Sequence, residues 1–469
     1  MKHLLSQEDK LGSMAIADSR LSLHSRPERS GPLLSRKMQL LDWWLKLLVP
    51  ALLVLLLAGA YHFGSLDTYL LLLSSRSYGA FLPALAATYA LVVLLFQLLR
   101  TVLWACYRPY PRAAGLLTSV TVVIPAYNEG AMVEQALDSV AASDYPREKL
   151  EIICIDDGST DDTWDYIARA QERYPGLLKT VRFPANRGKK EALYAGFIQA
   201  RGEILVTLDS DSVMEKDALG HLVAPLLADP QMGAVAGNVK VFNRNQSLMG
   251  KMQAVRFVNL DYLRASQSLY RTVICTPGSL SAYRREALTP ILSAWRRQTF
   301  LGAPCYHTED RALTNYILKR GYYTYYQRNA VVYTLVPETY LGVCRMYLRW
   351  ERGNVRESCV QLGYLFTRYR RKYRLMPIVE FFLSQLEYPL TLLFLGLLAA
   401  SIIAYPLMLF KFLTAVAVAS LLNLLYYIWL ERDLDFIYGI IYSYYAFFLL
   451  QWIYPYACVT VRHRGWLTR

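Results

Sequence analysis

Long apolar stretches at both ends of the chain constrain the fold most. Residues 47–63 and 81–99 are strongly apolar, and each approaches the roughly 20 residues that cross a bilayer. Further stretches of this kind follow at residues 389–405, 407–430 and 436–458. A long central segment of mixed composition separates the two groups. We therefore predict a central domain inserted between transmembrane helices, because buried core helices of this length would need a larger domain around them.

The composition agrees with this arrangement. Hydrophobic residues make up 54% of the chain and charged residues 19%, with a formal net charge of +14. Much of the positive excess lies beside the apolar stretches, where anionic lipid and the positive-inside rule explain it better than nucleic acid does. The seven cysteines show no Cys-x-x-Cys pair and no Cys/His ligand spacing, so we expect free thiols and no zinc site.

The expected domain boundaries follow the changes in composition. They are a disordered basic tail at 1–40, two transmembrane helices at 41–108, an α/β domain at 117–338, amphipathic interface helices at 339–374, C-terminal transmembrane helices at 376–460 and a basic tail at 461–469. The segment 339–374 is rich in Arg and aromatic residues, which is typical of a helix on a membrane surface. A solvated basic helix fits it less well, because Trp350, Leu362 and Phe366 are mixed in.

Short apolar runs alternate with longer amphipathic stretches in the central domain. Residues 120–125, 150–155 and 204–208 have the pattern of buried strands, and residues 130–142 and 161–174 that of helices between them. This alternation predicts a doubly wound α/β domain with a parallel sheet. Ligands of such sheets bind beyond the carboxyl ends of the strands, so polar motifs that follow strands are the candidate site.

Two carboxylates one residue apart follow the third predicted strand. Asp209 and Asp211 can hold one hard divalent cation, Mg²⁺ or Mn²⁺, and leave its other positions to a diphosphate. The alternative is that Asp211 or Ser212 caps a following helix. The spacing favours the metal site because a second acidic pair follows an earlier strand of the same sheet.

That second pair is Asp156 and Asp157. Carboxylates there can accept hydrogen bonds from a uracil imide or from ribose hydroxyls, although Asp-Gly is also favoured in a strand-end turn. Lys189 and Lys190 follow Gly188 at the head of a predicted helix, an arrangement that suits a diphosphate. A solvated basic turn is equally compatible with this last motif.

Glu309 and Asp310 precede a helical run at residues 313–320. Glycosyl transfer with inversion needs one carboxylate to take the proton from the attacking hydroxyl, and Asp310 is the candidate base. Acids are also favoured at helix N-termini for capping alone. Further on, Arg349 can bind a phosphate bidentately and Trp350 can stack on a sugar ring, with interfacial anchoring as the alternative.

Together, and in this order, the motifs resemble the processive, inverting membrane glycosyltransferases of family 2. That group includes hyaluronan synthases, rhizobial chitooligosaccharide synthases, poly-N-acetylglucosamine synthases and cellulose synthases, and the first two look most similar. The resemblance covers about residues 118–360. It rests on Asp209-Ser210-Asp211-Ser212, Cys275-Thr276-Pro277-Gly278, Ala282-Tyr283-Arg284-Arg285, Glu309-Asp310-Arg311, Arg349-Trp350 with Arg352, Arg356 and Glu357, and Trp466-Leu467-Thr468-Arg469.

The resemblance implies a GT-A fold and a set of site residues. The donor would be UDP-GlcNAc, UDP-GlcA or UDP-Glc, and the acceptor a growing polysaccharide. The implied donor-binding residues are Asp156, Asp157, Lys189, Asp209, Arg349, Trp350 and Trp466. The implied acceptor-binding residues are Cys275, Gly278 and Trp350, the metal ligands are Asp209 and Asp211, and the base is Asp310 beside Glu309.

One position departs from the family pattern. Met346 stands where the family has Gln, and a thioether cannot hydrogen-bond a sugar or a diphosphate as an amide can. This keeps open a non-processive enzyme that moves a single sugar to a lipid or a short acceptor. A non-enzymatic membrane scaffold is less compatible, because Asp209, Asp211 and Asp310 are all present.

Because nucleotide sugars are cytoplasmic, we expect the catalytic domain and the tail at 1–40 to lie in the cytoplasm. The helices would cross the inner or plasma membrane. Three full spans after that domain would leave the basic tail at 461–469 outside, against the positive-inside trend. One of the C-terminal stretches can therefore be re-entrant or interfacial instead.

Overall fold

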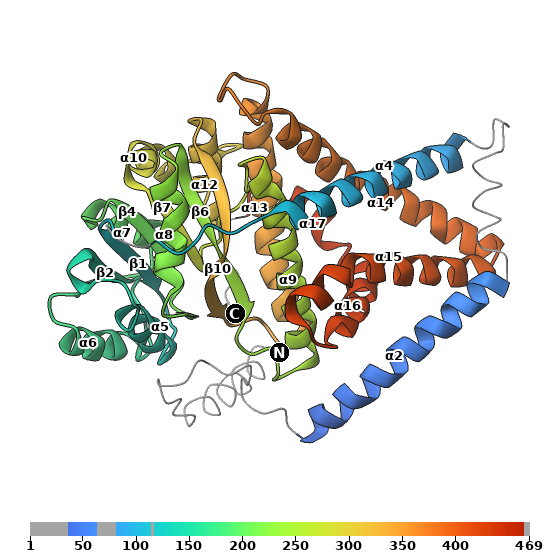
Figure 1. Ribbon diagram of the computed structural model, residues 1–469, viewed down its shortest axis with the longest axis horizontal. Helices are drawn as coiled ribbons and strands as arrows, with labels where there is room; N and C mark the ends of the chain where they lie inside the picture. Colours follow the sequence, from blue (N-terminus) through green and yellow to red (C-terminus); the bar gives the residue numbers. More distant parts are fainter. Residues whose placement is uncertain (1–35, 63–80, 114–116, 464–469) are drawn as a thin grey trace.

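The computed structural model describes residues 36–62, 81–113 and 117–463. An α/β domain forms one end of the molecule and long helices from both ends of the chain form the other (Figure 1). Most of the basic tail expected at 1–40, and Trp466 with the end of the C-terminal tail, lie outside the described residues.

An eight-stranded sheet organises the described part of the central domain. Its strands lie in the order β3-β2-β1-β4-β7-β6-β10-β5. The strands are β1 (Val120–Ala126), β2 (Leu150–Asp156), β3 (Leu178–Arg182), β4 (Ile204–Leu208), β5 (Ser212–Met214), β6 (Met232–Val241), β7 (Leu280–Arg284) and β10 (Tyr323–Thr334); β8 (Thr299–Phe300) and β9 (Ala303–Pro304) form a separate two-stranded ribbon.

The sheet is mixed, which corrects the parallel sheet predicted from the sequence. The three predicted strands are confirmed as β1, β2 and β4, and together with β3 they are parallel. However, β7 runs antiparallel to both β4 and β6, and β5 runs antiparallel to β10. Each antiparallel pair in this sheet includes β5 or β7, and the apolar runs had indicated neither of these strands.

Helices cover both faces of the sheet and bury its apolar side chains. They are α5 (Met132–Ala141), α6 (Thr163–Arg173), α7 (Lys189–Gln199), α8 (Ala218–Ala228), α9 (Leu248–Leu269), α10 (Arg285–Leu288), α11 (Leu292–Arg296) and α12 (Glu309–Lys319), with 3₁₀ turns at Arg147–Lys149 and Thr289–Ile291. On β1, Val122 and Ile124 belong to one core and Val123 to the other. This alternation is the two-residue period of a strand between two layers of helix.

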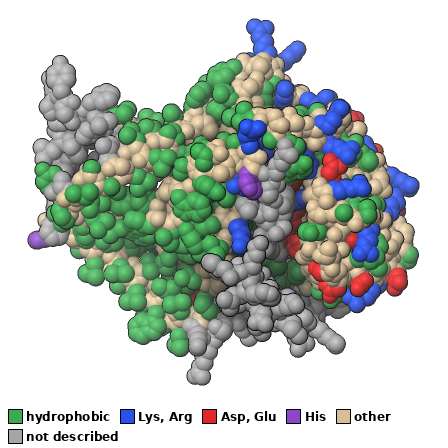
Figure 2. All heavy atoms as spheres, turned by 180° about the vertical axis from the view of Figure 1, so that it is seen from behind, with side chains coloured by type: hydrophobic (Ala, Val, Ile, Leu, Met, Phe, Trp, Pro, Cys, Tyr) green, Lys and Arg blue, Asp and Glu red, His purple; other side chains and the backbone are tan. Residues whose placement is uncertain are grey.

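Three of the long helices are each long and apolar enough to cross a membrane, within the described residues. Their apolar segments are Met38–Gly59 in α2 (Arg36–His62), Leu375–Ala400 in α14 (Leu375–Ala404) and Leu407–Glu431 in α15 (Leu407–Glu431). The second expected stretch lies in α4 (Phe81–Cys106), whose apolar segment Leu91–Cys106 is shorter. Figure 2 shows hydrophobic side chains over this end of the molecule and charged side chains gathered over the other. Exposed Trp43, Leu55 and Leu393 belong to the hydrophobic surface.

The last apolar stretch is broken. Helices α16 (Phe436–Leu449) and α17 (Ile453–Val459) meet at an angle of 46° and together count as a fourth candidate span or as a re-entrant element. Of the three C-terminal stretches, whose paths the sequence had left open, the third is the bent one.

Helix α13 (Tyr340–Leu365) is a single helix with a buried side and an exposed side. It lies between α12 and the bent pair α16–α17, and Met346, Arg352, Arg356 and Glu357 on it are buried. The sequence predicted a helix on the membrane surface for this segment. Its buried Arg352 and Arg356 hydrogen-bond within the protein, whereas Leu341 and Leu362 are exposed, so contact of this helix with a membrane surface stays a prediction.

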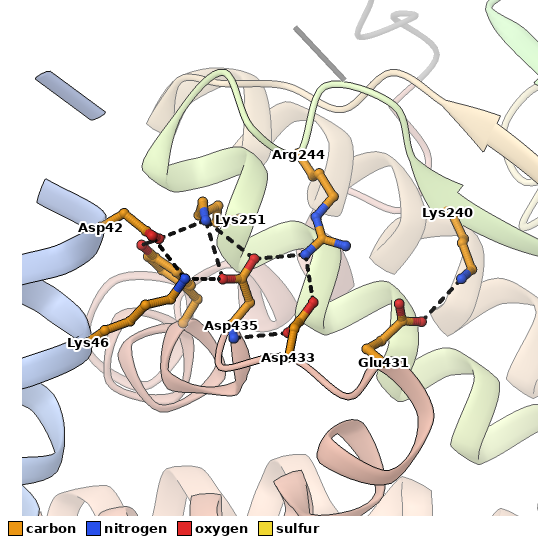
Figure 3. Close-up of polar contacts among 9 residues, drawn as sticks. Asp42, Lys46, Lys240, Arg244, Lys251, Glu431, Asp433 and Asp435 are labelled. Carbon is orange, nitrogen blue, oxygen red and sulfur yellow. Dashed lines mark hydrogen bonds and ion pairs between the residues drawn. The ribbon is translucent and has the colours of Figure 1, made fainter. Parts of the chain in front are cut away.

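A cluster of charged side chains joins the outer helices to the central domain (Figure 3). On α9, the Lys251 ammonium lies 2.7 Å from Asp42 of α2 and 3.3 Å from Asp435, which precedes α16. Lys46 of α2 lies 2.9 Å from the same Asp435, and Arg244 contacts it at 2.7 Å. Because Lys251 and Asp435 are nearly fully buried, these contacts fix α2 and the turn before α16 against α9.

Candidate active site

A cavity of about 530 Å³ lies beyond the carboxyl end of β4. The sequence-predicted residues that line it are Lys189, Asp209, Asp211, Cys275, Gly278, Glu309, Asp310, Arg349 and Trp350. They come from strand ends, from the start of α7, from the loop before β7, from the start of α12 and from α13. The chain thus brings together most of the residues that the sequence singled out.

Lys189 connects the two acidic pairs. Its ammonium nitrogen lies 2.6 Å from Asp209 Oδ1 and 3.0 Å from Glu309 Oε1. Burial lowers the pKa of Lys189, but the two carboxylates outweigh it and hold that pKa well above its ordinary value. Gly278 lies directly against this contact, because a Cβ there would be 2.9 Å from Lys189 Nζ. A charged lysine therefore lies in the cavity wall between Asp209 and Glu309.

The neighbouring acids Glu309 and Asp310 have opposite pKa shifts. Burial and the charge of Glu309 raise the pKa of Asp310 to about 6. Burial also opposes ionisation of Glu309, yet the nearby Lys189 outweighs it and lowers the pKa of Glu309. One oxygen of Asp310 accepts from the Gly278 backbone N–H at 3.2 Å and from the Cys275 thiol at 3.8 Å. Asp310 is thus the weaker acid of the two and the one that faces the loop before β7.

The backbone before these acids is strained. Thr308 has φ +59°, a left-handed conformation that is unfavourable for a β-branched residue. Gly353 of α13 lies against it, and the Arg349 carbonyl accepts from the Thr308 hydroxyl at 3.5 Å. Arg356, on the same helix as Gly353, donates to the His307 carbonyl. Helix α13 therefore holds the loop that positions Glu309 and Asp310, and the sequence motifs that contain Thr308 and Gly353 had given neither residue a role.

Asp209 and Asp211 fit a divalent cation that is completed by substrate. Both carboxylates face the cavity, and Asp211 Oδ1 also accepts from the Thr334 hydroxyl at 3.3 Å. Among the described residues, no group of three or more His, Cys, Asp or Glu side chains could hold a metal alone. Two hard oxygen ligands suit Mg²⁺ or Mn²⁺ when a diphosphate supplies the others. The helix-capping alternative is wrong, because Ser212 begins strand β5.

Asp156 and Asp157 lie behind the cavity rather than on its wall. Asp157 accepts from the backbone N–H groups of Arg187 at 2.7 Å and Gly188 at 2.8 Å, so it fixes the loop that presents Lys189. Asp156 accepts from the Ser159 N–H at 3.0 Å. A second hollow of about 370 Å³, lined by residues 158–160 and 182–184, lies beside them. The predicted contact with a nucleoside would be made from this hollow.

The loop before β7 is also held by contacts that lead to the long outer helices. The Gln267 side chain accepts from the Ile274 N–H at 3.3 Å and donates to Glu380 of α14 at 2.9 Å. Glu380 is buried and pairs with Arg100 of α4 at 3.2 Å. The position of Cys275 and Gly278 beside Asp310 therefore depends on two of the outer helices. Sequence reasoning missed Gln267 and Glu380, which belong to no motif.

The cavity continues past Trp350 between the helices. Trp350 packs against Phe257 and Tyr347, with ring centroids 6.4 and 5.5 Å apart. Beyond them the wall includes Tyr388 of α14, Tyr442 of α16 and Tyr454 of α17, and Met346 lies on the same wall. The cavity thus extends from the acidic pairs to helices that can cross a membrane.

Paired carboxylates follow a parallel strand of a mixed α/β sheet and share a cavity with a second acidic pair at the start of α12, which is the arrangement expected of a glycosyltransferase of the GT-A fold. A family model for glycosyl transferase family 2 matches residues 121–292. An N-acetylglucosaminyltransferase of Azorhizobium caulinodans is 30% identical over 366 residues, which cover 76% of this chain and 89% of that protein. The chain belongs to glycosyltransferase family 2.

Two further comparisons agree. The hyaluronan synthase of Streptococcus pyogenes is 29% identical over 391 residues, covering 81% of this chain and 90% of that protein. A mannosyltransferase from Pyrobaculum calidifontis, solved in complex with GDP-Man and Mn²⁺, superposes with a TM-score of 0.55 at 26% identity, covering 78% of this chain and 98% of that one. The expected fold class and family are confirmed, and the chain is a glycosyltransferase.

Proposed function

We propose that this chain is a membrane-embedded, inverting glycosyltransferase that polymerises a β-linked polysaccharide from a UDP-sugar and moves the product across the membrane. One observation supports this most. A single cavity is lined at one end by Asp209, Asp211 and Asp310 and at the other by Tyr388 and Tyr442 of the apolar helices. A sugar chain elongated at the acids would extend directly between those helices.

Asp310 is the proposed base. It takes the proton of the acceptor hydroxyl while that oxygen attacks the anomeric carbon and the bond to the UDP diphosphate breaks, with inversion at that carbon. A pKa of about 6 leaves Asp310 ionised at neutral pH and still basic enough to accept a proton. The backbone N–H of Gly278 and the thiol of Cys275 hold the carboxylate toward the acceptor side.

The leaving diphosphate is bound by charge. Lys189 and Arg349 line the cavity and would face the phosphates. Asp209 and Asp211 would hold Mg²⁺ or Mn²⁺, which when bound neutralises charge on the departing nucleotide. The mannosyltransferase neighbour with GDP-Man and Mn²⁺ supports this assignment. Asp157 contributes by fixing the loop at Gly188 and thereby the position of Lys189.

The names of two relatives narrow the choice of donor, and the donor in turn bears on the location of the central domain. An N-acetylglucosaminyltransferase and a hyaluronan synthase among them support UDP-GlcNAc, with UDP-GlcA or UDP-Glc as the other candidates. Cytoplasmic UDP-sugars would place the central domain in the cytoplasm and the helices in the inner or plasma membrane. The broken pair α16–α17, as a re-entrant element, would bring the basic C-terminal tail back to the cytoplasmic side.

A single-transfer enzyme is the second candidate. Met346 is buried in the cavity wall, so the position where the family has an amide offers an acceptor no hydrogen bond. Such an enzyme would move one sugar to a lipid or a short acceptor and release it.

The test is transfer from radiolabelled UDP-GlcNAc, UDP-GlcA and UDP-Glc, singly and in pairs, by the full chain in purified membranes with Mn²⁺ or Mg²⁺. Long polymer on a sizing gel supports the processive synthase, and the donors required identify the product. Short or lipid-extractable product supports the second candidate. Absence of both transfer and UDP release with every donor would overturn the proposal.

A further inference from the structure

The second lysine at the head of α7 has no part in the chemistry described above. The sequence suggested that both Lys189 and Lys190 suit a diphosphate, but only Lys189 of the two lines the cavity. Successive residues of a helix point about 100° apart, so the two side chains leave α7 in different directions. Lys190 points into the protein, where it is 4% exposed, and its ammonium donates to the Cys305 carbonyl at 3.1 Å. It therefore reaches the loop that leads to the proposed base rather than the cavity.

That loop is held by side chains from three helices. Every second carbonyl of the segment 305–309 accepts a hydrogen bond from a side chain of α7, α13 or α11. The donors and their acceptors are Lys190 to Cys305, Arg356 to His307 and Trp295 to Glu309. The bond from Trp295 Nε1 is 3.0 Å long. Lys190 Nζ also lies 5.3 Å from the centre of the Trp295 ring, within the range of a cation–π contact. Lys190 and Trp295 thus hold the same segment and contact each other.

The charge of Lys190 is not balanced by an acid at close range. Among the described residues, no carboxylate oxygen lies within the 4.0 Å of an ion pair from its ammonium. The acids that act on it from a distance have other partners, because Glu357 pairs with Arg356 at 2.9 Å and Glu309 with Lys189 at 3.0 Å. Burial lowers the pKa of Lys190 to about 8, which leaves the ammonium mostly charged at neutral pH. The partners of this cation are therefore a carbonyl oxygen and an aromatic face.

We propose that Lys190 is a positioning residue, which ties the donor end of α7 to the base Asp310 through the segment 305–309. This inference rests on the proposed function and adds to it a residue that lies outside the cavity. Lys189 would face the diphosphate, and Lys190 beside it holds the backbone that leads into Glu309 and Asp310. A single turn of α7 thus connects the donor side to the base side, and the position of one depends on the position of the other.

The test measures sugar transfer and UDP release by the full-length protein in nanodiscs, with UDP-GlcNAc, UDP-GlcA and UDP-Glc supplied singly and in pairs. Lys190→Met keeps an unbranched side chain and removes the charge and the hydrogen-bond donor. Turnover should fall by about tenfold or more, because a displaced base is no longer aligned with the acceptor hydroxyl. The KM for the donor should stay within about twofold of its original value, because Lys190 does not line the cavity.

Further variants separate the charge from the side-chain volume. Lys190→Arg keeps a charged donor and should recover part of the turnover. Trp295→Phe keeps an aromatic ring and removes the donor to the Glu309 carbonyl, so it should lower turnover several-fold and leave the donor KM unchanged. Lys319→Met is the matched control, because Lys319 is exposed at the other end of α12. Thermal unfolding of each variant checks folding.

The decisive comparison adds Lys190→Met to Asp310→Asn. If Lys190 acts only through the position of the base, the added change should lower the residual transfer by less than about twofold, because residues that act as a unit are not additive. General damage to the domain would instead lower the residual transfer by the same factor as in the unaltered protein. The same comparison applies to Trp295→Phe, which decides the matter if Lys190→Met does not fold.

Unchanged turnover in a folded Lys190→Met protein would overturn the inference. So would a fall in turnover that recurs in full in the Asp310→Asn background, or an effect confined to the donor KM, which would return Lys190 to donor binding. Failure of the proposed function itself would look different, because the unaltered protein would then transfer no sugar and release no UDP with any of the donors.

Discussion

Gly353 of α13 lies so close to Thr308 that a Cβ on the glycine would be 1.6 Å from the Thr308 hydroxyl oxygen. Thr308 has a left-handed backbone and immediately precedes the two acids of α12. The orientation of Glu309 and Asp310 therefore depends on the absence of a side chain at position 353.

Gly353→Ala is expected to displace that loop. Overpacking of this kind costs about 1–3 kcal/mol, and a shift of the base should lower the turnover number by about tenfold or more. Thermal unfolding and initial rates of transfer measure the two effects. Gly363→Ala on the same helix is the control, because nothing lies within 4 Å of a Cβ there. Unchanged turnover in Gly353→Ala would contradict the role given to α13.

The pKa of Asp310 predicts an acid limb in the pH profile. Because Asp310 must be ionised to accept a proton, kcat/KM should rise with pH through about 6 and then level. Glu309→Gln removes one of the charges that raise this pKa, so the limb should move to lower pH. Asp310→Asn should lower turnover by roughly 10²–10⁴-fold without unfolding the protein. A limb that moves to higher pH in Glu309→Gln would contradict the assignment.

Metal dependence is expected from Asp209 and Asp211. A chelator should abolish transfer, and Mn²⁺ or Mg²⁺ should restore it. Loss of a group that merely supports a metal ligand costs about 10–100-fold in affinity, so Asp211→Asn should raise the half-activating metal concentration by at least about tenfold. Full activity after exhaustive chelation would show that Lys189 and Arg349 alone neutralise the diphosphate.

The buried ion cluster of Figure 3 predicts a large stability effect. Lys251→Met leaves Asp42 and Asp435 with only the more exposed Lys46 as a shared partner, and breaking a buried pair costs about 3–5 kcal/mol. Lys240→Met removes a more exposed pair with Glu431 and should cost at most about 1 kcal/mol. Thermal unfolding in detergent compares the two variants. Equal melting temperatures would mean that α2 is held by apolar contacts alone.

The contacts of Gln267 predict that its replacement changes the KM for the acceptor more than the KM for the donor. Gln267→Leu removes both the hydrogen bond to the Ile274 N–H and the one to Glu380, which frees the loop that contains Cys275 and Gly278. The KM for the acceptor should rise several-fold, by more than the KM for the UDP-sugar. Glu380→Gln keeps a hydrogen-bonding group and should be milder than Glu380→Ala. A rise confined to the donor KM would contradict this placement.

The sequence predicted those features that local patterns encode. The apolar run 204–208 became β4 with the same bounds, and the polar residues after it line the cavity, because strand ends meet at one edge of the sheet. The antiparallel β7 begins 72 residues after the last residue of β4, and such pairing has no local signature. Gln267 and Glu380 were missed for a similar reason, because only the packing of α9 against α14 brings them together behind the loop before β7.

The donor end and the acceptor end of the cavity are built from different segments of the chain. Lys189, Asp209 and Asp211 come from strand ends and the helix after them, whereas Arg256, Trp350 and Tyr442 come from α9, α13 and α16. Helix α13 joins the two ends, because Arg349 on it would face the diphosphate while Gly353 packs on the loop that carries Asp310. An engineer who exchanged α13 would therefore alter both ends, whereas a change confined to α16 would leave the donor end intact.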